Sequence, residues 1–322
     1  MADYIRTFGE MNREDFQLAG GKAANLGELT RNGFNVPGGF CVTSNALPYV
    51  IAENGLQPRI DETIASFDYE DLDDFDRKTG LIRELIVQAR IPEDLLKEIQ
   101  TAITVLRGGD DPFVAVRSSV AVKDSTISSF PGMMDTYHYL RGEAEILDHI
   151  RRCWASLWTS RAATTRHYKN IDHGLGLIVS IVQRMVHSEV AGVLFTANPI
   201  SGSRDEMVLE ANWGLGESVV SGKSRNDYFV LAKSPLAVKD RKILKKTLIV
   251  VFDEARGRGR TEAVPTEEQM EAATLSDEQL LELGAVGLRI EEVFGCPQDI
   301  EWAYAGGELF ILQSRKIRGL QT

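Results

Sequence analysis

The end of the chain constrains the fold most, because its polar and apolar side chains alternate on both sides of a turn. Residues 299–305 read DIEWAYA and residues 308–315 read ELFILQSR, with Gly306 and Gly307 between them. Successive side chains of a β-strand point to opposite faces of the sheet, so the pattern predicts an antiparallel hairpin. A three-residue turn at residues 306–308 would pair Ala305 with Leu309.

One face of this predicted hairpin is polar. The register places Glu301 opposite Gln313 and Asp299 opposite Arg315, whereas a two-residue turn would scatter these side chains over both faces. A carboxylate facing an amide oxygen suits Mg²⁺, and a neighbouring arginine can stabilise a transferring phosphoryl group. The apolar face is expected to carry Ile300, Trp302, Tyr304, Phe310 and Leu312.

Three earlier stretches contain groups that suit an anionic ligand. Gly20-Gly21-Lys22 begins a predicted helix, and the N–H groups of a helix start can face an anion. Arg117 follows the predicted strand at residues 113–116, where a guanidinium can bind phosphate in two-pronged fashion. The loop at residues 128–136 offers backbone N–H groups and a threonine hydroxyl. Each stretch also has a structural interpretation: a plain turn for residues 20–22, an ion pair with an acidic residue for Arg117, and a surface loop for residues 128–136.

Composition narrows the class of protein. Of 322 residues, 43% are hydrophobic, which is typical of a globular protein and excludes disorder of the whole chain. Lys and Arg number 36 against 47 Asp and Glu, so the net charge of −11 argues against general nucleic-acid binding. Three widely spaced cysteines predict reduced thiols rather than disulfides or a zinc site. With no apparent signal peptide and no membrane-spanning stretch, we expect a cytoplasmic protein that binds neither membrane nor nucleic acid.

The order of the predicted elements gives the organisation. The first half is rich in helices, including a long one expected over residues 143–168. The second half is mostly strands, of which 177–186 and 190–195 are expected to be adjacent, followed by a helix at 276–294. We therefore expect an α+β chain with an N-terminal lobe at residues 1–185, a C-terminal lobe at residues 186–322, and a cleft between them.

Five motifs in order resemble the nucleotide-binding domain of the phosphoenolpyruvate synthase and pyruvate phosphate dikinase family, which rifampicin phosphotransferase shares. They are GGKAANLG at residues 20–27, VPGGF at 36–40, VRSS at 116–119, FPGMMDT at 130–136, and the pair DIEW at 299–302 with LQSR at 312–315. The resemblance covers nearly the whole chain. It implies an ATP-grasp fold, in which two lobes clamp a nucleotide in the cleft between them.

The resemblance also implies a role for each matching residue. The expected catalytic residues are Lys22, Arg117 and Arg315. The expected ATP and Mg²⁺ contacts are Lys22 and Arg117 on phosphates, Gly132 and Thr136 in a phosphate-covering loop, Gln183 on the adenine-binding strand, Glu217 near the ribose or adenosine, Glu301 and Gln313 on Mg²⁺, and Arg315 on the transferring phosphate.

In the family mechanism, the β,γ-diphosphate of Mg·ATP passes to a carrier histidine and AMP is released. The five histidines of this chain do not lie in the Gly-Gly-x-x-x-His setting of that carrier. The resemblance therefore implies a phosphotransferase module, excised or standalone, whose phosphohistidine domain lies in another domain or chain. The final acceptor would be pyruvate or an antibiotic hydroxyl. A nucleotide-sensing module without turnover is the alternative.

Overall fold

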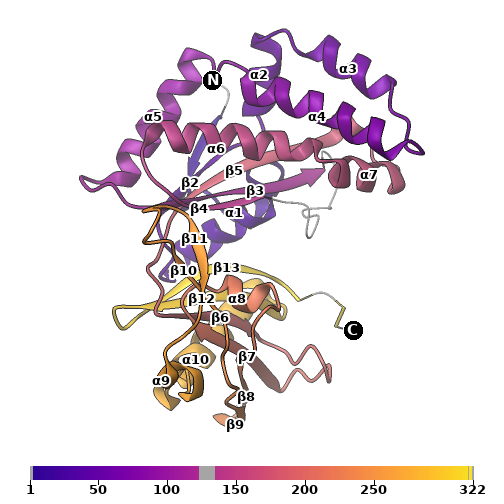
Figure 1. Ribbon diagram of the computed structural model, residues 1–322. Helices are drawn as coiled ribbons and strands as arrows, with labels where there is room; N and C mark the ends of the chain where they lie inside the picture. The colour runs from indigo at the N-terminus through magenta and orange to yellow at the C-terminus, as the bar shows by residue number, and fades with distance from the viewer. Residues whose placement is uncertain (1–2, 123–134, 318, 321–322) are drawn as a thin grey trace. The chain divides into compact units, whose positions relative to one another are not determined.

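The computed structural model describes residues 3–122, 135–317 and 319–320, and the chain divides into two compact units (Figure 1). Unit 1 comprises Met1–Glu28 and Gly38–Met185, whereas unit 2 comprises Leu29–Pro37 and Val186–Thr322. Each unit combines helices with an antiparallel sheet. This confirms the predicted α+β class.

The sheet of unit 1 has five strands in the order β1-β2-β5-β3-β4. They are β1 (Ile5–Thr7), β2 (Gly39–Val42), β3 (Val114–Val122), β4 (Thr136–Leu140) and β5 (Gly176–Arg184). Every neighbouring pair is antiparallel. Alternation gives this sheet one apolar face, where Val116, Val120, Ile178 and Val182 join the core of the unit.

Helices cover this apolar face. They are α2 (Ala46–Glu53), α3 (Gln57–Ala65), α4 (Leu72–Gln88), α5 (Glu93–Arg107), α6 (Glu143–Ala155) and α7 (Ser160–Tyr168). The helix α6 packs on β3 and β5, and α4 packs on α6 (Figure 1). The single helix predicted over residues 143–168 is wrong: α6 gives way to a 3-10 turn, η3 (Ser156–Trp158), and α7 starts afresh. Thr159 has extended backbone dihedrals and its side chain accepts from Ala162 N, which caps a new helix.

The sheet of unit 2 has six strands in the order β13-β12-β6-β7-β8-β9. They are β6 (Val190–Phe195), β7 (Glu206–Trp213), β8 (Asp227–Lys233), β9 (Leu236–Lys242), β12 (Gln298–Ala305) and β13 (Glu308–Lys316). The helix α10 (Asp277–Phe294) packs against β6, β8, β9 and β12. A separate hairpin joins β10 (Ile249–Phe252) to β11 (Arg260–Ala263), and two short helices are α8 (Glu217–Val220) and α9 (Glu267–Glu271). Since β5 and β6 belong to different sheets, the expectation that they are adjacent strands is wrong.

The hairpin of β12 and β13 has the predicted polar register but not the predicted turn. Glu301 is opposite Gln313 and Asp299 is opposite Arg315, as expected. However, Ala305 pairs with Glu308, so the turn contains only Gly306 and Gly307, both at positive φ. An irregularity between Glu301 and Trp302, opposite the additional residue Leu312, restores the register. Trp302 consequently pairs with Ile311 rather than Leu312, and Tyr304 pairs with Leu309 rather than Phe310.

The cysteines agree with the expectation of reduced thiols. All three are free, and Cys41 and Cys153 are buried. Burial raises the pKa of both of these thiols, which keeps them protonated. Within residues 3–122, 135–317 and 319–320, no helix has the length and apolar character needed to cross a membrane.

Candidate functional site

In unit 1, the polar candidates lie on the sheet face opposite α6. Arg117 is directly opposite Thr136 on β4 and Ile181 on β5, and Gln183 lies two residues further along β5. The Arg117 Nη1 donates to Gln183 Oε1 at 3.4 Å. The side chain of Gln183 is buried, at 4% exposure. The sheet therefore presents a cation, an amide and a hydroxyl next to one another on one face.

Lys22 is held beside this face by the backbone turn at Gly20, two residues before it. The helix α1 (Phe16–Arg31) is interrupted at Gly20, whose φ of 69° and ψ of 158° are not helical. A Cβ at Gly20 would lie 2.5 Å from Ser119 Oγ, so only glycine allows this close approach. The Lys22 amide then donates to Ser119 Oγ at 3.4 Å, and its Nζ donates to Ser118 O at 3.3 Å. The ammonium of Lys22 thus lies at the β3 strand that carries Arg117.

Most of the loop predicted at residues 128–136, including Gly132, lies outside the residues that the structure describes. Thr136 begins β4, is half-buried, and pairs with Arg117. Sequence reasoning missed the two serines after Arg117 as positioning groups. The only sequence feature that could have indicated this role is that Ser118 and Ser119 directly follow Arg117. In the structure both serines are nearly fully buried.

In unit 2, a polar row crosses the sheet on the face opposite α10. Gln313, Glu301, Val193 and Glu210 are consecutive direct partners across β13, β12, β6 and β7. Directly opposite residues share a face of the sheet, so these side chains point the same way. Glu210 was not predicted from the sequence, because only the pairing of β6 with both β12 and β7 brings it into the row. Its carboxylate accepts from Asn226 Nδ2 at 3.3 Å.

Asp299 and Arg315 form the next cross-strand pair on this face. The Arg315 Nε donates to Asp299 Oδ2 at 2.8 Å, while the arginine side chain remains 51% exposed. Burial raises the pKa of Asp299, the positive charge of Arg315 opposes that rise, and the negative charge of Glu301 adds to it. The carboxylate therefore orients a guanidinium that still reaches solvent.

Glu217 reaches the same face of the sheet but makes an ion pair. It begins α8, which packs on β6 and β7, and a Cβ on the preceding Gly216 would touch Ala191. Arg260 on β11 forms a salt bridge with the Glu217 carboxylate. No sequence signal links these two residues, which are separated by 43 positions. Any adenosine contact by Glu217 would have to share the carboxylate with Arg260.

These groups can bind anions and hard cations. Among the described residues there is no cluster of three or more His, Cys, Asp or Glu that could hold a metal by itself. Glu301 and Gln313 offer two adjacent oxygen donors, which fits Mg²⁺ when a ligand and water supply the other oxygens. Lys22, Arg117 and Arg315 supply positive charge in an acidic chain.

Comparison with known families and proteins gives consistent similarities. Residues 16–322 match the family described as "Pyruvate phosphate dikinase, AMP/ATP-binding domain". A probable phosphoenolpyruvate synthase from Pyrococcus horikoshii is 37% identical over 99% of this chain and 44% of its own length. The probable phosphoenolpyruvate synthase from Methanocaldococcus jannaschii is 39% identical over 99% of this chain and 27% of its own length. Rifampicin phosphotransferase from Bacillus cereus is 36% identical over 99% of this chain and 36% of its own length.

The chain therefore spans less than half the length of these three curated relatives. Among solved structures, D-alanine–D-alanine ligase from Bacillus anthracis aligns over 76% of this chain and 66% of its own, at 9% identity and a TM-score of 0.25. That TM-score is too low to support an argument about the fold.

Proposed function

Because the chain belongs to the pyruvate phosphate dikinase AMP/ATP-binding domain family, we propose that it is the ATP-binding phosphotransferase module of a phosphoenolpyruvate synthase-like or pyruvate phosphate dikinase-like enzyme. In this proposal it adopts the ATP-grasp arrangement and passes phosphate from Mg·ATP to a carrier histidine outside this chain. Pyruvate is the favoured final acceptor, since several relatives are named phosphoenolpyruvate synthases. An antibiotic hydroxyl is the alternative acceptor, in line with the rifampicin phosphotransferase relatives.

The observation that carries the proposal is the polar pairing on the hairpin of unit 2. Glu301 opposite Gln313 would hold Mg²⁺, which would neutralise charge on the phosphates when it is bound. Arg315, oriented by Asp299 and half exposed, would contact the phosphoryl group that is transferred. A carboxylate, an amide and an arginine in this register are better explained by the binding of a metal-bound polyphosphate than by simple exposure of a polar strand face to solvent.

Unit 1 contributes the remaining positive charge. Lys22 and Arg117 would bind phosphate oxygens, with Thr136 donating its hydroxyl from the position opposite Arg117. Gln183 would lie beside the adenine, on the strand that pairs with both β2 and β3. Arg117 and Gln183 already contact each other, so a nucleotide would meet two side chains that hold one another in place.

The carrier histidine is proposed to lie elsewhere because histidines of unit 1 have structural contacts. His149 Nδ1 bonds to Glu145 O at 2.8 Å. His167 stacks on Tyr69 with ring centroids 3.6 Å apart. His173 bonds to Tyr69 and Arg166. A carrier imidazole needs a ring that is free to attack a phosphorus atom in line, whereas the rings of His149, His167 and His173 are each held by a neighbouring group.

Calorimetric titration with ATP, with and without Mg²⁺, tests the binding step. In Glu301→Gln we expect the affinity for ATP to fall about tenfold or more in the presence of Mg²⁺, because a charged ligand contact contributes about 1.5–3 kcal/mol. Affinity without Mg²⁺ should change little. The matched control is Glu278→Gln, which alters an exposed carboxylate in the first turn of α10. Equal losses with and without Mg²⁺ would remove Glu301 from the metal site.

Product analysis tests the transfer step against the nucleotide-sensing alternative. The chain is mixed with labelled Mg·ATP and a separately produced histidine domain of a phosphoenolpyruvate synthase. We expect AMP and an acid-labile phosphohistidine on that domain. Tight ATP binding without either product would favour a sensing module.

A further inference from the structure

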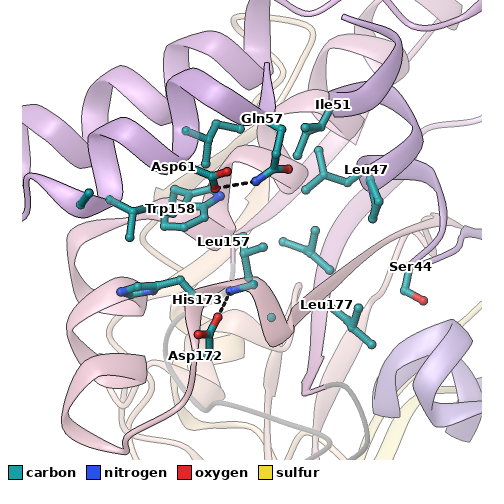
Figure 2. Close-up of a pocket in the computed structure, with 17 residues that line it drawn as sticks. Ser44, Leu47, Ile51, Gln57, Asp61, Leu157, Trp158, Asp172, His173 and Leu177 are labelled. Atoms are coloured by element: carbon teal, nitrogen blue, oxygen red, sulfur yellow. Dashed lines mark hydrogen bonds between the residues drawn. The ribbon is translucent and has the colours of Figure 1, made fainter. Parts of the chain in front are cut away.

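Unit 1 contains a cavity that the proposed function does not use (Figure 2). It has a volume of about 510 Å³ and lies between α2, α3, η3, the 3-10 turn η4 (His173–Leu175) and the first residues of β5. Ile178 in the cavity wall and Gln183 are five residues apart on β5, which corresponds to about 16 Å at 3.3 Å per residue. Their side chains also point to opposite faces of the sheet. The cavity is therefore separate from the polar face that carries Arg117.

The inner walls of the cavity are apolar and buried. Leu47, Ile60, Leu157, Trp158 and Ile178 line it, and each is at most 5% exposed. Figure 2 shows Trp158 and Leu157 from the η3 turn facing Ile51 and Leu47 from α2. The volume falls within the range of small-molecule sites, roughly 300–1,000 Å³. An apolar group of a ligand would gain burial here without displacing the core.

The polar groups of the cavity are mostly at its exposed rim, and they are predominantly acceptors. Asp61 and Asp172 both line it, from α3 and from the segment before η4. Gln57 Nε2 donates to Asp61 Oδ1 at 2.7 Å, and Gly174 N donates to Asp172 Oδ1 at 2.7 Å (Figure 2). These contacts use Oδ1 of each carboxylate. In the part of the chain that is described, neither aspartate forms a salt bridge.

Among the described residues that line the cavity there is no lysine or arginine to balance these carboxylates. His173 lines the cavity, but burial and, next, the charge of Arg166 lower its pKa to about 4, so the ring is neutral at physiological pH. Arg166 is buried at 3% exposure and does not line the cavity; its guanidinium lies over the Trp158 ring at 5.0 Å and donates to Leu157 O and His173 Nδ1. The lining thus combines apolar walls with two negative charges.

We propose that this cavity binds a small organic cation, with an apolar body against Trp158 and Leu157 and an ammonium group at one of the rim carboxylates, Asp61 or Asp172. The apolar walls alone would accept many ligands. The two carboxylates select among them, because an ammonium gains charge-assisted hydrogen bonds where a carboxylate ligand meets repulsion. This site is independent of the proposed nucleotide site, so either proposal can fail without the other.

Three probes of similar size and different charge test the proposal by calorimetry on the full chain: phenylbutylamine, phenylbutanol and phenylbutyrate. We expect the amine to bind once per chain and about tenfold or more tighter than the alcohol, with the butyrate weakest. Substituting both Asp61→Asn and Asp172→Asn should reduce the affinity for the amine to that for the alcohol. The carboxamides can still accept from Gln57 and Gly174, so folding should be preserved. Asp73→Asn, an exposed carboxylate on α4 away from the cavity, is the matched control.

A filled cavity gives a second test that does not depend on charge. Ala65 is exposed and lines the cavity, so Ala65→Trp should abolish binding of the amine and the alcohol. Ala52→Trp, at an exposed position of α2 that does not line the cavity, should leave both unchanged. The proposal is overturned if the amine does not saturate, if amine and alcohol bind equally, or if Ala65→Trp binds as the wild type does.

Discussion

Replacing Asp227 by asparagine should destabilise unit 2 strongly, because it removes the negative partner of a fully buried lysine. Lys246 Nζ lies 2.7 Å from Asp227 Oδ1, and both side chains have 0% exposure. The lysine also donates to Ala272 O at 2.7 Å. The carboxylate accepts from Leu244 N at 3.1 Å and from the amide and hydroxyl of Thr274 at 2.8 and 3.0 Å. The pair thereby connects the segments around residues 244–246 and 272–274 to the start of β8 by hydrogen bonds.

The expected loss is about 3–5 kcal/mol, the typical cost of leaving one buried charge without its partner. An amide at Asp227 keeps the shape but offers only one acceptor oxygen to four donor groups. The intact pair need not be strongly stabilising for this to hold, because desolvation of both charges offsets much of their attraction. Substituting Lys246→Met in addition should therefore recover part of the loss.

Hydrogen exchange measured by mass spectrometry is the suitable assay, because it reports the two units separately. The slowest amides of β7 and β12 should exchange roughly a hundred to several thousand times faster in Asp227→Asn, at 1.36 kcal/mol per tenfold. Peptides of unit 1 serve as the internal control. The reasoning is refuted if the single variant loses less than about 1 kcal/mol, or if adding Lys246→Met makes unit 2 less stable still.

Three further changes test other features. Gly20→Ala should lower the free energy of unfolding by about 1–3 kcal/mol, because Gly20 has a φ of 69° and an added Cβ would meet Ser119. It should also weaken ATP binding, because Ser119 accepts from the amide of Lys22. Thermal melting and calorimetry check these effects, and an unchanged melting temperature would contradict the first. The pKa of His173 is lowered from 6.5 to about 4, so the folded state binds fewer protons than the unfolded state and stability should fall as pH drops from about 6.5 towards 4. His173→Gln should flatten this part of the curve of unfolding free energy against pH, and a curve of unchanged slope would show that other groups are responsible. Arg315→Met should slow phosphoryl transfer more than it weakens ATP binding, and comparing single-turnover rates with affinities distinguishes the two effects.

The hairpin shows what alternation can and cannot predict. The pairing of Glu301 with Gln313 was predicted correctly from a turn that was one residue too long. The pairing is still correct because Leu312, the additional residue, lies within β13 as a bulge, which offsets the residue that is absent from the turn. Alternation of side chains reports which residues share a face, but it does not report where an unpaired residue is inserted. The Gly306-Gly307 dipeptide is the local sequence signal for the shorter turn, because a two-residue turn of this kind needs positive φ, which both glycines adopt.

Other features depended on contacts that a single segment does not reveal. The break after α6 requires Thr159 to cap α7, although the apolar spacing around Trp154 and Trp158 reads as one continuous helix. Glu210 enters the polar row only through the pairing of β6 with two neighbours. The cavity has walls from segments between residues 44 and 178, each of which reads as an ordinary apolar surface.

The chain passes between the two units three times, and this limits how recombination can divide it. The chain changes unit after residues 28, 37 and 185, and the first of these changes falls within α1. Leu29 and Phe34 are buried in the core of unit 2 although they precede nearly all of unit 1 in sequence. A gene rearrangement that separated residues 186–322 would leave that core without these side chains. A recombination event that keeps both cores intact would therefore have to carry both units together, in keeping with synthase and phosphotransferase relatives that both match 99% of the chain.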